Sequence, residues 1–365
     1  MQKMIARLAR GLVLWAWMAS VAHAETPPAE IRVGAPALVF DGNSYWGALG
    51  IARYKGWLDQ EFAKDHVKID LIGYRGGAPM VGLALANSQI DFAGQGDLLS
   101  IIGRSSGMQT RLILPGDKLA NAYLAVAPNS TIHSIEDLRG KRVAYYKGNQ
   151  IQLQVIRILA QHGLTEKDIL SVGMDPATAS IGLTSGDVDA VFSGDDLLAL
   201  RDRGLGKIVY STQGQPALTS YNGIIVRDAF ARQYPETTER FVKVLVRAAA
   251  WASDPANRQE VLHIWGLGPM HRIYIDEDFK DRPWVDRQSA LLDPLFVAHY
   301  RETQDLVAQL GLLRGPKFDV DTWIDRSFLD KALKDLNLEH YWSPLDAGGK
   351  PLTADGGTGA ASGRT

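Results

Sequence analysis

Short loops rich in glycine and hydrogen-bonding side chains follow apolar, strand-like runs at five places in this chain of 365 residues. A helix-like pattern begins directly after each loop. The free backbone N–H groups and the positive dipole end of a helix start stabilise a negatively charged group. These loops could therefore bind an anion without breaking any bond. They span residues 40–46, 74–79, 94–97, 147–152 and 192–196.

The stretch 147–150, which reads KGNQ, gives the clearest case. Gly148 lets a ligand approach the backbone, and Asn149 and Gln150 supply side-chain donors. Lys147 adds a positive charge, although such a charge can equally point to solvent. A tight turn with an N-cap is the simpler alternative. We expect the backbone N–H groups of Gly148, Asn149 and Gln150 to be the anion contacts, ahead of Lys147.

The loops of the first half carry a similar set of groups. Arg75 could supply a charge, and Gly77, like its neighbour Gly76, permits a close approach to the backbone. Aromatic residues at or beside the loops could form the wall of a pocket for the apolar part of a ligand. These aromatic residues are Tyr45, Trp46, Tyr74 and Tyr146. For any single loop, plain turn chemistry remains an alternative.

Sequence signatures of an enzyme active site are absent. The eight histidines are scattered without a His-x-x-x-His pair, and neither G-x-S-x-G nor a P-loop occurs. Asp195 and Asp196 could form an acid/base pair, or one could cap a helix beside a solvated neighbour. We therefore predict no catalytic residue, metal or cofactor, and we count Asp195 among the ligand-binding residues.

The N-terminus predicts export. Lys3, Arg7 and Arg10 precede the apolar run 11–21, and Ala22-His23-Ala24 offers a cleavage site. A membrane anchor is the alternative, but the run is shorter than the roughly 20 residues of a span. We expect cleavage after Ala24 and a soluble periplasmic protein. The chain has no cysteine, so its core alone must stabilise it. Its net charge of -2 gives no support to nucleic-acid binding.

The order of predicted elements indicates an α/β protein with two similar units. Strands at 31–34, 67–72 and 90–93 alternate with helical patterns at 46–58 and 80–87. Strands at 141–146, 169–172 and 188–192 alternate with helical patterns at 151–162 and 179–184. The units end alike, in IDFAGQGDLL from Ile90 and VDAVFSGDDLL from Val188, where an Asp precedes Gly-Asp by five residues.

Two extended connections, at 112–128 and 208–226, flank the second unit and suggest two lobes joined by a hinge with two crossings. A long helix is expected to begin at Pro235. The Gly-, Ala-, Thr- and Ser-rich end predicts disorder. The expected divisions are a signal peptide at 1–24, a first lobe at 25–115, a second lobe at 116–221, a return to the first lobe at 222–342 and a disordered tail at 343–365.

Several longer stretches carry a family resemblance. They are GALGIARYKGWLDQEF (47–62), GGAPMVGLALANSQIDFAGQGD (76–97), SIEDLRGKRVAYYKGNQIQLQVIRILAQHGLTEKDI (134–169), LTSGDVDAVFSGDD (183–196) and IDRSFLDKAL (324–333). On these the chain resembles the substrate-binding proteins of bacterial ABC importers, in the branch for aliphatic sulfonates, taurine and nitrate. The resemblance implies the two-lobe periplasmic-binding-protein fold (type II). Each lobe would have a mixed, mostly parallel sheet flanked by helices, with a two-strand hinge between them and a ligand closing the cleft.

The resemblance also implies which loops contact the ligand. The family's recognition loops fall on Asn43, Ser44, Tyr45, Gly77, Ala78, Gly96, Asp97, Gly148, Asn149 and Gln150. Two departures bear on the ligand. Family loops at 148–150 often carry a hydroxyl residue where this chain has Asn-Gln, and FDGNSYW (40–46) is bulkier than many. These departures admit an aromatic or larger organosulfur ligand as well as a simple alkanesulfonate.

The function implied is the capture of a small organic anion, foremost a sulfonate. The protein would act as a monomer and deliver its ligand to an inner-membrane ABC permease with a cytoplasmic ATPase. Alternatives are a binding protein for nitrate or an aromatic carboxylate, a chemoreceptor partner, and an enzyme on the same scaffold, desulfinase-like or pyrimidine-synthesis-like. The desulfinase is expected to use a cysteine, which this chain lacks, and the export signal argues against an intracellular enzyme.

Overall fold

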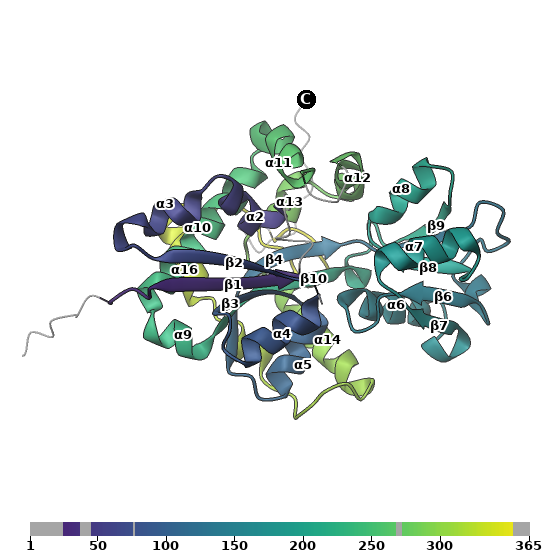
Figure 1. Ribbon diagram of the computed structural model, residues 1–365, viewed down its shortest axis with the longest axis horizontal. Coiled ribbons are helices and arrows are strands. Elements are labelled where there is room, and N and C mark those ends of the chain that lie inside the picture. Colours follow the sequence, from purple (N-terminus) through teal and green to yellow (C-terminus); the bar gives the residue numbers. More distant parts are fainter. Residues whose placement is uncertain (1–24, 37–44, 76, 268–271, 353–365) are drawn as a thin grey trace, which may run out of the picture.

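The computed structural model describes residues 25–36, 45–75, 77–267 and 272–352 (Figure 1). The predicted signal peptide, its cleavage point after Ala24, and the candidate site residues Asn43 and Ser44 lie outside the described residues. Within the described part, no helix is both long enough and apolar enough to cross a bilayer.

The first lobe is built on a five-stranded sheet with the order β2-β1-β3-β10-β4. Its strands are β1 (Glu30–Pro36), β2 (Lys68–Tyr74), β3 (Phe92–Gly96), β4 (Thr110–Ala120) and β10 (Ser220–Arg227). β1 pairs in parallel with β2 and β3, whereas β10 is antiparallel to both β3 and β4. Four strands therefore run one way and one runs the other, as the predicted mostly parallel sheet requires.

The second lobe repeats this arrangement in the order β7-β6-β8-β5-β9. Its strands are β5 (Tyr123–Val126), β6 (Arg142–Tyr145), β7 (Leu170–Gly173), β8 (Ala190–Ser193) and β9 (Lys207–Ser211). Here β5 is the antiparallel strand, between β8 and β9. Alternate residues of β6 enter different hydrophobic clusters: Val143 and Tyr145 pack on one face of the sheet and Ala144 on the other. Both faces are thus covered by apolar side chains.

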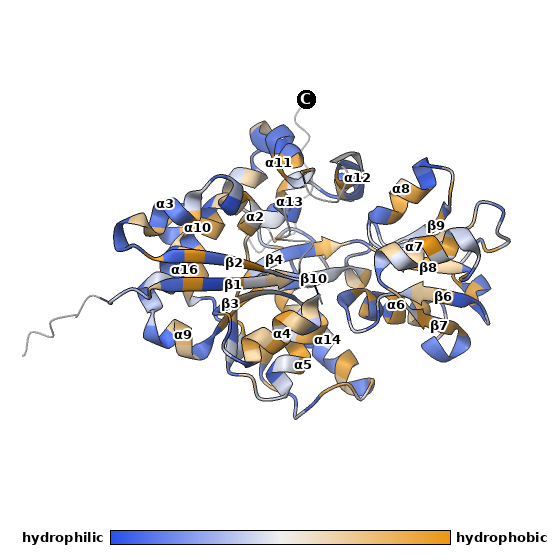
Figure 2. Ribbon diagram, in the orientation of Figure 1, coloured by the Kyte–Doolittle hydropathy of each residue, from blue (hydrophilic) through white to orange (hydrophobic). Residues whose placement is uncertain are grey.

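Helices cover both faces of each sheet. In Figure 1, three helices lie on one side of the first sheet: α4 (Ala78–Ala86), α5 (Asp97–Ser105) and α14 (Pro294–Gln309). Three others lie on the opposite side: α2 (Gly47–Tyr54), α3 (Trp57–Phe62) and α10 (Pro235–Ser253). α4 is mostly apolar along its length (Figure 2). The helices of the second lobe are α6 (Gln150–Gln161), α7 (Pro176–Ser185) and α8 (Asp196–Asp202). The remaining helices are α9 (Asp228–Gln233), α11 (Arg258–Trp265), α12 (Arg272–Asp278), α13 (Trp284–Gln288), α15 (Val320–Trp323) and α16 (Ser327–Leu336).

The long helix begins at Pro235, as predicted. The helical pattern at 46–58 forms two helices instead of one, because Gly56 takes a left-handed conformation with φ of 66° between Tyr54 and Trp57.

Each of the two lobes contains an equivalent Arg–Asp ion pair. In the first lobe, the Asp91 carboxylate accepts hydrogen bonds from the backbone N–H of Arg32 (3.0 Å) and from the guanidinium of the same residue (2.7 and 3.0 Å). In the second lobe, Asp189 accepts the same three bonds from Arg142 (2.7, 2.7 and 3.2 Å). Asp91 and Asp189 are the repeated aspartates of the two similar sequence endings, so the repeat detected in the sequence is a repeat in space.

The chain crosses between the lobes twice, as the two extended connections predict. The first crossing joins β4 to β5 and the second joins β9 to β10. The predicted lobe boundary after residue 115 falls inside β4, because Pro115-Gly116-Asp117 forms an irregularity within the strand and not its end. The boundary after residue 221 similarly falls inside β10, which begins at Ser220.

The segment expected to be disordered from residue 343 is packed at its start. Leu345 is 2% exposed, and its backbone N–H lies 3.4 Å from Asp293 Oδ2 while its carbonyl accepts from Leu295 N (3.2 Å). The prediction of disorder is therefore wrong for residues 343–352. Their composition is typical of a loop, but the buried Leu345 fixes the segment to the first lobe. Residues 353–365 lie outside the described part.

Candidate functional site

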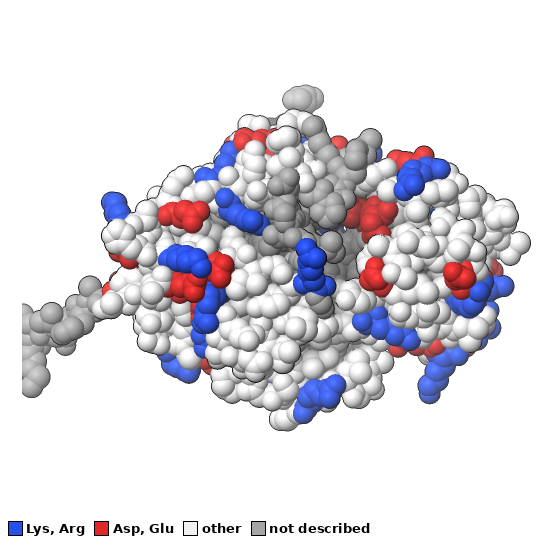
Figure 3. Space-filling view, viewed as in Figure 1, with Lys and Arg blue, Asp and Glu red and all other residues white. Residues whose placement is uncertain are grey.

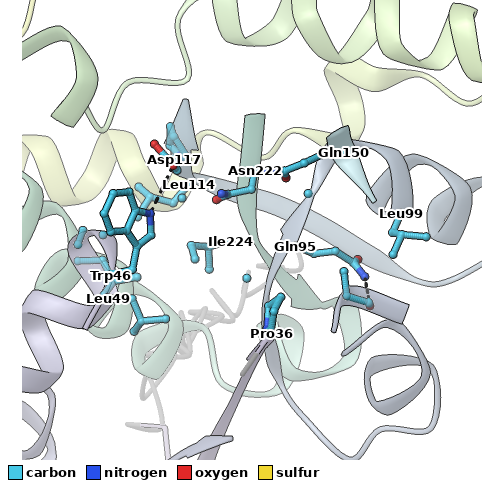
Figure 4. Close-up of a pocket in the computed structure, with 18 of the residues that line it drawn as sticks. Pro36, Trp46, Leu49, Gln95, Leu99, Leu114, Asp117, Gln150, Asn222 and Ile224 are labelled. Carbon is cyan, nitrogen blue, oxygen red and sulfur yellow. Dashed lines mark hydrogen bonds between the residues drawn. The ribbon is translucent and has the colours of Figure 1, made fainter. Parts of the chain in front are cut away.

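A cavity of about 330 Å³, which we call the first cavity, lies between the two lobes. Figure 4 shows its wall, with Trp46 and Leu49 on one side, Asp117, Asn222 and Gln150 along the top, and Gln95 opposite Trp46. Residues of the first sheet and its helices form most of the wall, and Asn149 and Gln150 come from the second lobe. A ligand in this cavity would therefore touch both lobes.

Four helix starts converge on the first cavity. The lining includes residues 47–49 at the start of α2, Ala78 at the start of α4, Gly96 at the N-cap of α5, and residues 149–150 at the start of α6. Each helix has eight or more residues, so each contributes free N–H groups and a positive dipole end. The described lining of the first cavity contains no lysine or arginine and one carboxyl group, that of Asp117. The four helix starts are therefore the groups that would stabilise an anion there.

The turn before α6 explains why Lys147 is not part of the cavity. Gly148 takes a φ of 75°, and its N–H donates to Gln152 Oε1 (2.9 Å). This turn sends the Lys147 side chain back to β7, where Nζ donates to Ser171 Oγ (2.8 Å). Asn149 and Gln150 are left facing the cavity, and the side chain of Asn149 makes no capping hydrogen bond.

A second cavity of about 280 Å³ adjoins the first and shares four of its lining residues: Trp46, Asp117, Asn149 and Gln150. It reaches into the second lobe, where Phe192 and the start of α8 line it. Four carboxyl groups line this second cavity, those of Asp117, Asp195, Asp196 and Asp278. In the space-filling view, acidic side chains border the gap between the lobes on the side of the second lobe (Figure 3).

Burial perturbs all four of these carboxyl groups. It raises the pKa of Asp117 to about 6, against the smaller opposing effects of Arg287 and of the Trp46 indole. It likewise raises the pKa of Asp196 to about 6, against a hydrogen bond from Ser193. Burial, with the neighbouring Asp278 and Asp196 charges, raises the pKa of Asp195 well above its ordinary value. Burial also raises the pKa of Asp278.

Five of the candidate residues from the sequence line these cavities. Ala78, Gly96, Asn149 and Gln150 line the first cavity, and Asp195 lines the second together with Asn149 and Gln150. Gly77 lies where the first lobe faces the second. A Cβ added to Gly77 would lie 3.2 Å from the hydroxyl of Tyr146, which lines the second cavity.

Tyr45, Arg75, Asp97 and Gly148 are not among the described lining residues of either cavity. Tyr45 packs edge-on against Tyr54 with its ring under Arg53, and Arg75 is exposed. Asp97 is fully buried at the start of α5, where its Oδ2 lies 2.6 Å from Nε2 of His299. Burial lowers the pKa of His299.

Sequence reasoning missed several lining residues. Asp117 and Asn222 face each other across β4 and β10 at an irregular register, and Asn222 Oδ1 occupies the space where a Cβ on Gly116 would be. The sequence did contain a signal for these two residues. Gly116 precedes Asp117 and Gly223 follows Asn222, and a glycine inside an extended run predicts a bulge. Trp265, whose ring centroid lies 4.6 Å from that of Trp46, comes from the distant α11 and gives no local signal.

No group of three or more His, Cys, Asp or Glu side chains with the geometry of a metal site is found in the described residues. The arrangement instead combines an aromatic wall, convergent helix starts and amide side chains between two lobes. These features are typical of a site that encloses a small molecule.

A family model described as NMT1/THI5 like matches residues 43–257, which is more than half of the chain. The chain belongs to the NMT1/THI5-like family. This NMT1/THI5-like chain is 26% identical over 84% of its length to an aliphatic sulfonates-binding protein of Bacillus subtilis (strain 168), of which the match covers 89%. The family resemblance drawn from the sequence is thereby confirmed.

Solved structures agree with the two-lobe fold. The periplasmic sulfonate-binding protein SsuA from Methylobacillus flagellatus KT superposes with a TM-score of 0.73 and 28% identity, over 88% of this chain and 99% of that one. A mutant of the desulfurization enzyme DSZB, in complex with biphenyl-2-sulfinic acid, reaches a TM-score of 0.67 at 18% identity, over 84% of this chain and 100% of that one. At that identity the NMT1/THI5-like chain shares only the fold with the enzyme.

Proposed function

We propose that this NMT1/THI5-like protein is the periplasmic solute-binding component of an ABC importer and that it captures a small organic anion, most specifically a sulfonate. Two relatives support the proposal by name, the aliphatic sulfonates-binding protein of Bacillus subtilis and the sulfonate-binding protein SsuA of Methylobacillus flagellatus KT. No bond is broken in this function. The protein encloses its ligand and presents it to a permease that works with a cytoplasmic ATPase.

The observation that carries the proposal is the convergence of four helix starts from two lobes on one cavity. A sulfonate has three acceptor oxygens and one charge spread over them, so it matches several N–H donors that surround it. Asn149 and Gln150 add amide donors from the second lobe, and Trp46 offers an aromatic face to the carbon part of the ligand. Closure of the lobes over the anion would remove water and strengthen these contacts.

An enzyme on the same scaffold is not favoured. The desulfinase-like alternative expects a cysteine, and the chain has none. The first cavity also presents no nucleophile beside a base among its described lining residues.

We further propose that the protein works as a monomer, that its signal is cleaved after Ala24, and that its ligand-binding residues are the candidates that line the two cavities. Mass spectrometry of the mature protein from the periplasm and sedimentation analysis of the purified protein test the first two.

Titration calorimetry tests the function with a panel of alkyl and aryl sulfonates, sulfate, nitrate and an aromatic carboxylate. We expect at least one sulfonate to bind more tightly than nitrate or the carboxylate. If none of the sulfonates binds, the proposal is wrong. Product formation from an aryl sulfinate by the purified protein would instead favour the enzyme.

Asn149→Ala tests the site. We expect about tenfold or greater loss of sulfonate affinity with an unchanged melting temperature, because one donor to the anion is removed from a preformed cavity. The matched control is Asn87→Ala, since Asn87 is exposed just after α4, outside both cavities. Equal affinity in Asn149→Ala and the wild type would move the anion away from the start of α6.

A further inference from the structure

The helices α4 and α7 hold equivalent places in the two lobes. α4 joins β2 to β3 and α7 joins β7 to β8, and these strands occupy the same positions in the two sheet orders. The paired aspartates Asp91 and Asp189, which follow the two helices, are 98 residues apart. At the same spacing, Leu85 of α4 and Leu183 of α7 are both buried. The repeat therefore relates the two helices residue by residue.

An exposed apolar side chain stands at the same position in both helices. Leu83 is 52% exposed and Ile181 is 67% exposed, and these two residues are also 98 apart. Among the exposed large apolar side chains of the described residues, no other pair has this separation. One exposed leucine is ordinary on a protein surface. Its recurrence at the equivalent position, in two helices whose sequences otherwise differ, indicates a contact that both lobes make.

The surface around these two side chains carries little charge. Neither α4, APMVGLALA, nor α7, PATASIGLTS, contains a charged residue, although the outer face of a surface helix normally carries several. Figure 1 shows both helices toward the viewer, one in each lobe, and the surface over them is largely white in Figure 3. Charged residues are depleted at the centres of protein interfaces, so these two faces suit contact with another protein.

The two positions lie on opposite sides of the cleft. Ala78, the first residue of α4, lines the first cavity, and Pro176, the first residue of α7, lines the second. Leu83 and Ile181 each lie five residues further along, which is about 7–8 Å along the helix axis. The distance between them therefore changes when the lobes open or close. A partner that contacts both positions together recognises one arrangement of the lobes.

The extent of this surface fits a transient partner. α4 has four exposed residues and α7 has five, whereas a stable interface takes roughly 20–30 residues from each partner. The surface is thus too small for a stable dimer of this chain, but it suits a delivery protein that must leave its partner again. Two equivalent contact points also match a partner with two equivalent halves, and two-fold pairs are the commonest symmetric assemblies.

We propose that Leu83 and Ile181 form a two-point docking surface for the membrane permease, each entering an apolar socket on one of two equivalent permease subunits. This inference rests on the proposed function and adds to it the surface that meets the permease. Because both points are engaged together, docking favours the arrangement of the lobes that presents them at the correct separation.

Leu83→Gln and Ile181→Gln test the docking surface separately from ligand binding. Each substitution makes the exposed side chain polar without touching either cavity, so calorimetry should give the wild-type sulfonate affinity. In cells of the source bacterium that carry the variant in place of the wild type, we expect uptake of a radiolabelled sulfonate to fall about tenfold or more. The sulfonate used is the one that the purified wild type binds most tightly. The matched control is Leu170→Gln, because Leu170 is 59% exposed at the start of β7, away from the cleft. It should leave both affinity and uptake unchanged.

The outcomes separate docking from binding. Normal uptake in either Leu83→Gln or Ile181→Gln would overturn the two-point surface while leaving a sulfonate-binding function intact. A loss of affinity that matches the loss of uptake would also overturn it, since the residues would then act through the cleft. If the wild type binds no sulfonate, the proposed function is contradicted, and the docking proposal with it.

The absence of cysteine from the chain allows a direct test of the partner. Leu83→Cys and Ile181→Cys each introduce a single thiol, to which a photoactivatable maleimide can be attached. After illumination of the labelled, ligand-loaded protein with membranes of the source bacterium, we expect both positions to form adducts with permease subunits, identified by mass spectrometry. Leu170→Cys should form none. Adducts that join two copies of this chain, or permease adducts that form equally at all three positions, would overturn the proposal.

Discussion

Gln150 of the second lobe lies directly over Gly96 of the first. A methyl group added to Gly96 would come within 2.5 Å of Gln150 Oε1. The backbone of Gly96 has a φ of -67°, which any residue can adopt, so glycine is required here for close approach and not for its conformation. The lobes thus meet at the helix starts that line the first cavity.

Gly96→Ala should therefore impair ligand binding more than folding. The added methyl group displaces the far end of the flexible Gln150 side chain, which removes an amide donor from the cavity and holds the lobes apart. We expect about tenfold or greater loss of sulfonate affinity by calorimetry, with the free energy of unfolding changed by less than about 1 kcal/mol.

Gly173→Ala is the matched control for this prediction. Gly173 ends β7 outside both cavities, and an added Cβ would lie at an ordinary 3.5 Å from the Lys147 side chain. Its affinity should equal that of the wild type. Equal affinities for Gly96→Ala and Gly173→Ala would mean that the contact between Gln150 and Gly96 does not form in the bound protein.

The buried carboxyl of Asp117 should make the ligand-free protein less stable as the pH rises. Its pKa is about 6 in the folded state against an ordinary value of 3.8, chiefly through burial. A raised folded pKa contributes stability that is present below about pH 4 and is lost as the pH rises through about 6. A shift of this size corresponds to at most about 3 kcal/mol.

Asp117→Asn isolates this contribution. Urea unfolding without ligand should give equal stabilities for variant and wild type at pH 4, and a more stable variant at pH 7. His299, whose pKa is lowered by burial, opposes the trend in the wild type, but it is present in both proteins and cancels in the difference. If the difference in unfolding free energy between the variant and the wild type is the same at pH 4 and pH 7, Asp117 reaches solvent.

Much of the fold could be predicted from the sequence because its signals are local and repeated. Apolar runs followed by glycine-rich turns predicted most of the parallel strands in the two sheets. The two similar sequence endings, which contain Asp91 and Asp189, predicted the two lobes. What those aspartates bind was not predictable from spacing alone. Their partners, Arg32 and Arg142, lie in the first strand of each unit and reach them only after the strands pair.

The site was predictable only where it follows a strand in sequence. Ala78, Gly96, Asn149 and Gln150 are such residues, and all line the first cavity. Asp117, Asn222 and Trp265 reach it from the crossing strands and from α11, so their positions depend on tertiary packing. The acidic second cavity is likewise assembled from segments far apart in the sequence, which is why an overall charge of -2 gave no hint of it.

A buried ion pair fixes the C-terminal segments to the first sheet. Lys118 Nζ on β4 lies 3.2 Å from Asp293 Oδ2, and both side chains are 1% exposed. Asp293 also caps α14 by accepting from Phe296 N (3.0 Å). Lys118→Met would leave the Asp293 carboxylate buried without its cation. We expect a loss of about 3–5 kcal/mol in the free energy of unfolding, measured with urea at neutral pH.

Lys331→Met provides the comparison for Lys118→Met. Lys331 pairs with Asp335 one turn along α16 at 3.1 Å, but its side chain is 47% exposed. Exposed pairs at this spacing contribute about 0.3–0.5 kcal/mol. Similar losses in the two variants would indicate that water reaches Lys118.

Gln154 connects α6 to both crossings between the lobes. Its buried amide donates to Ala120 O at the end of β4 (2.9 Å) and to Leu218 O just before β10 (3.3 Å). Gln154 lies one turn after Gln150, so the helix that faces the cavity is also bonded to both connections. Gln154→Leu removes this donor and leaves both carbonyls without their hydrogen bond. We expect the free energy of unfolding, measured with urea, to fall by about 1–3 kcal/mol.

Gln161→Leu is the control for Gln154→Leu. Gln161 lies at the exposed end of α6 and makes one weak hydrogen bond to Gln215 (3.4 Å), so its free energy of unfolding should stay within about 0.5 kcal/mol of that of the wild type. Equal effects of the two substitutions would mean that the crossings do not depend on α6, and that the start of this helix can move in the cavity without the hinge.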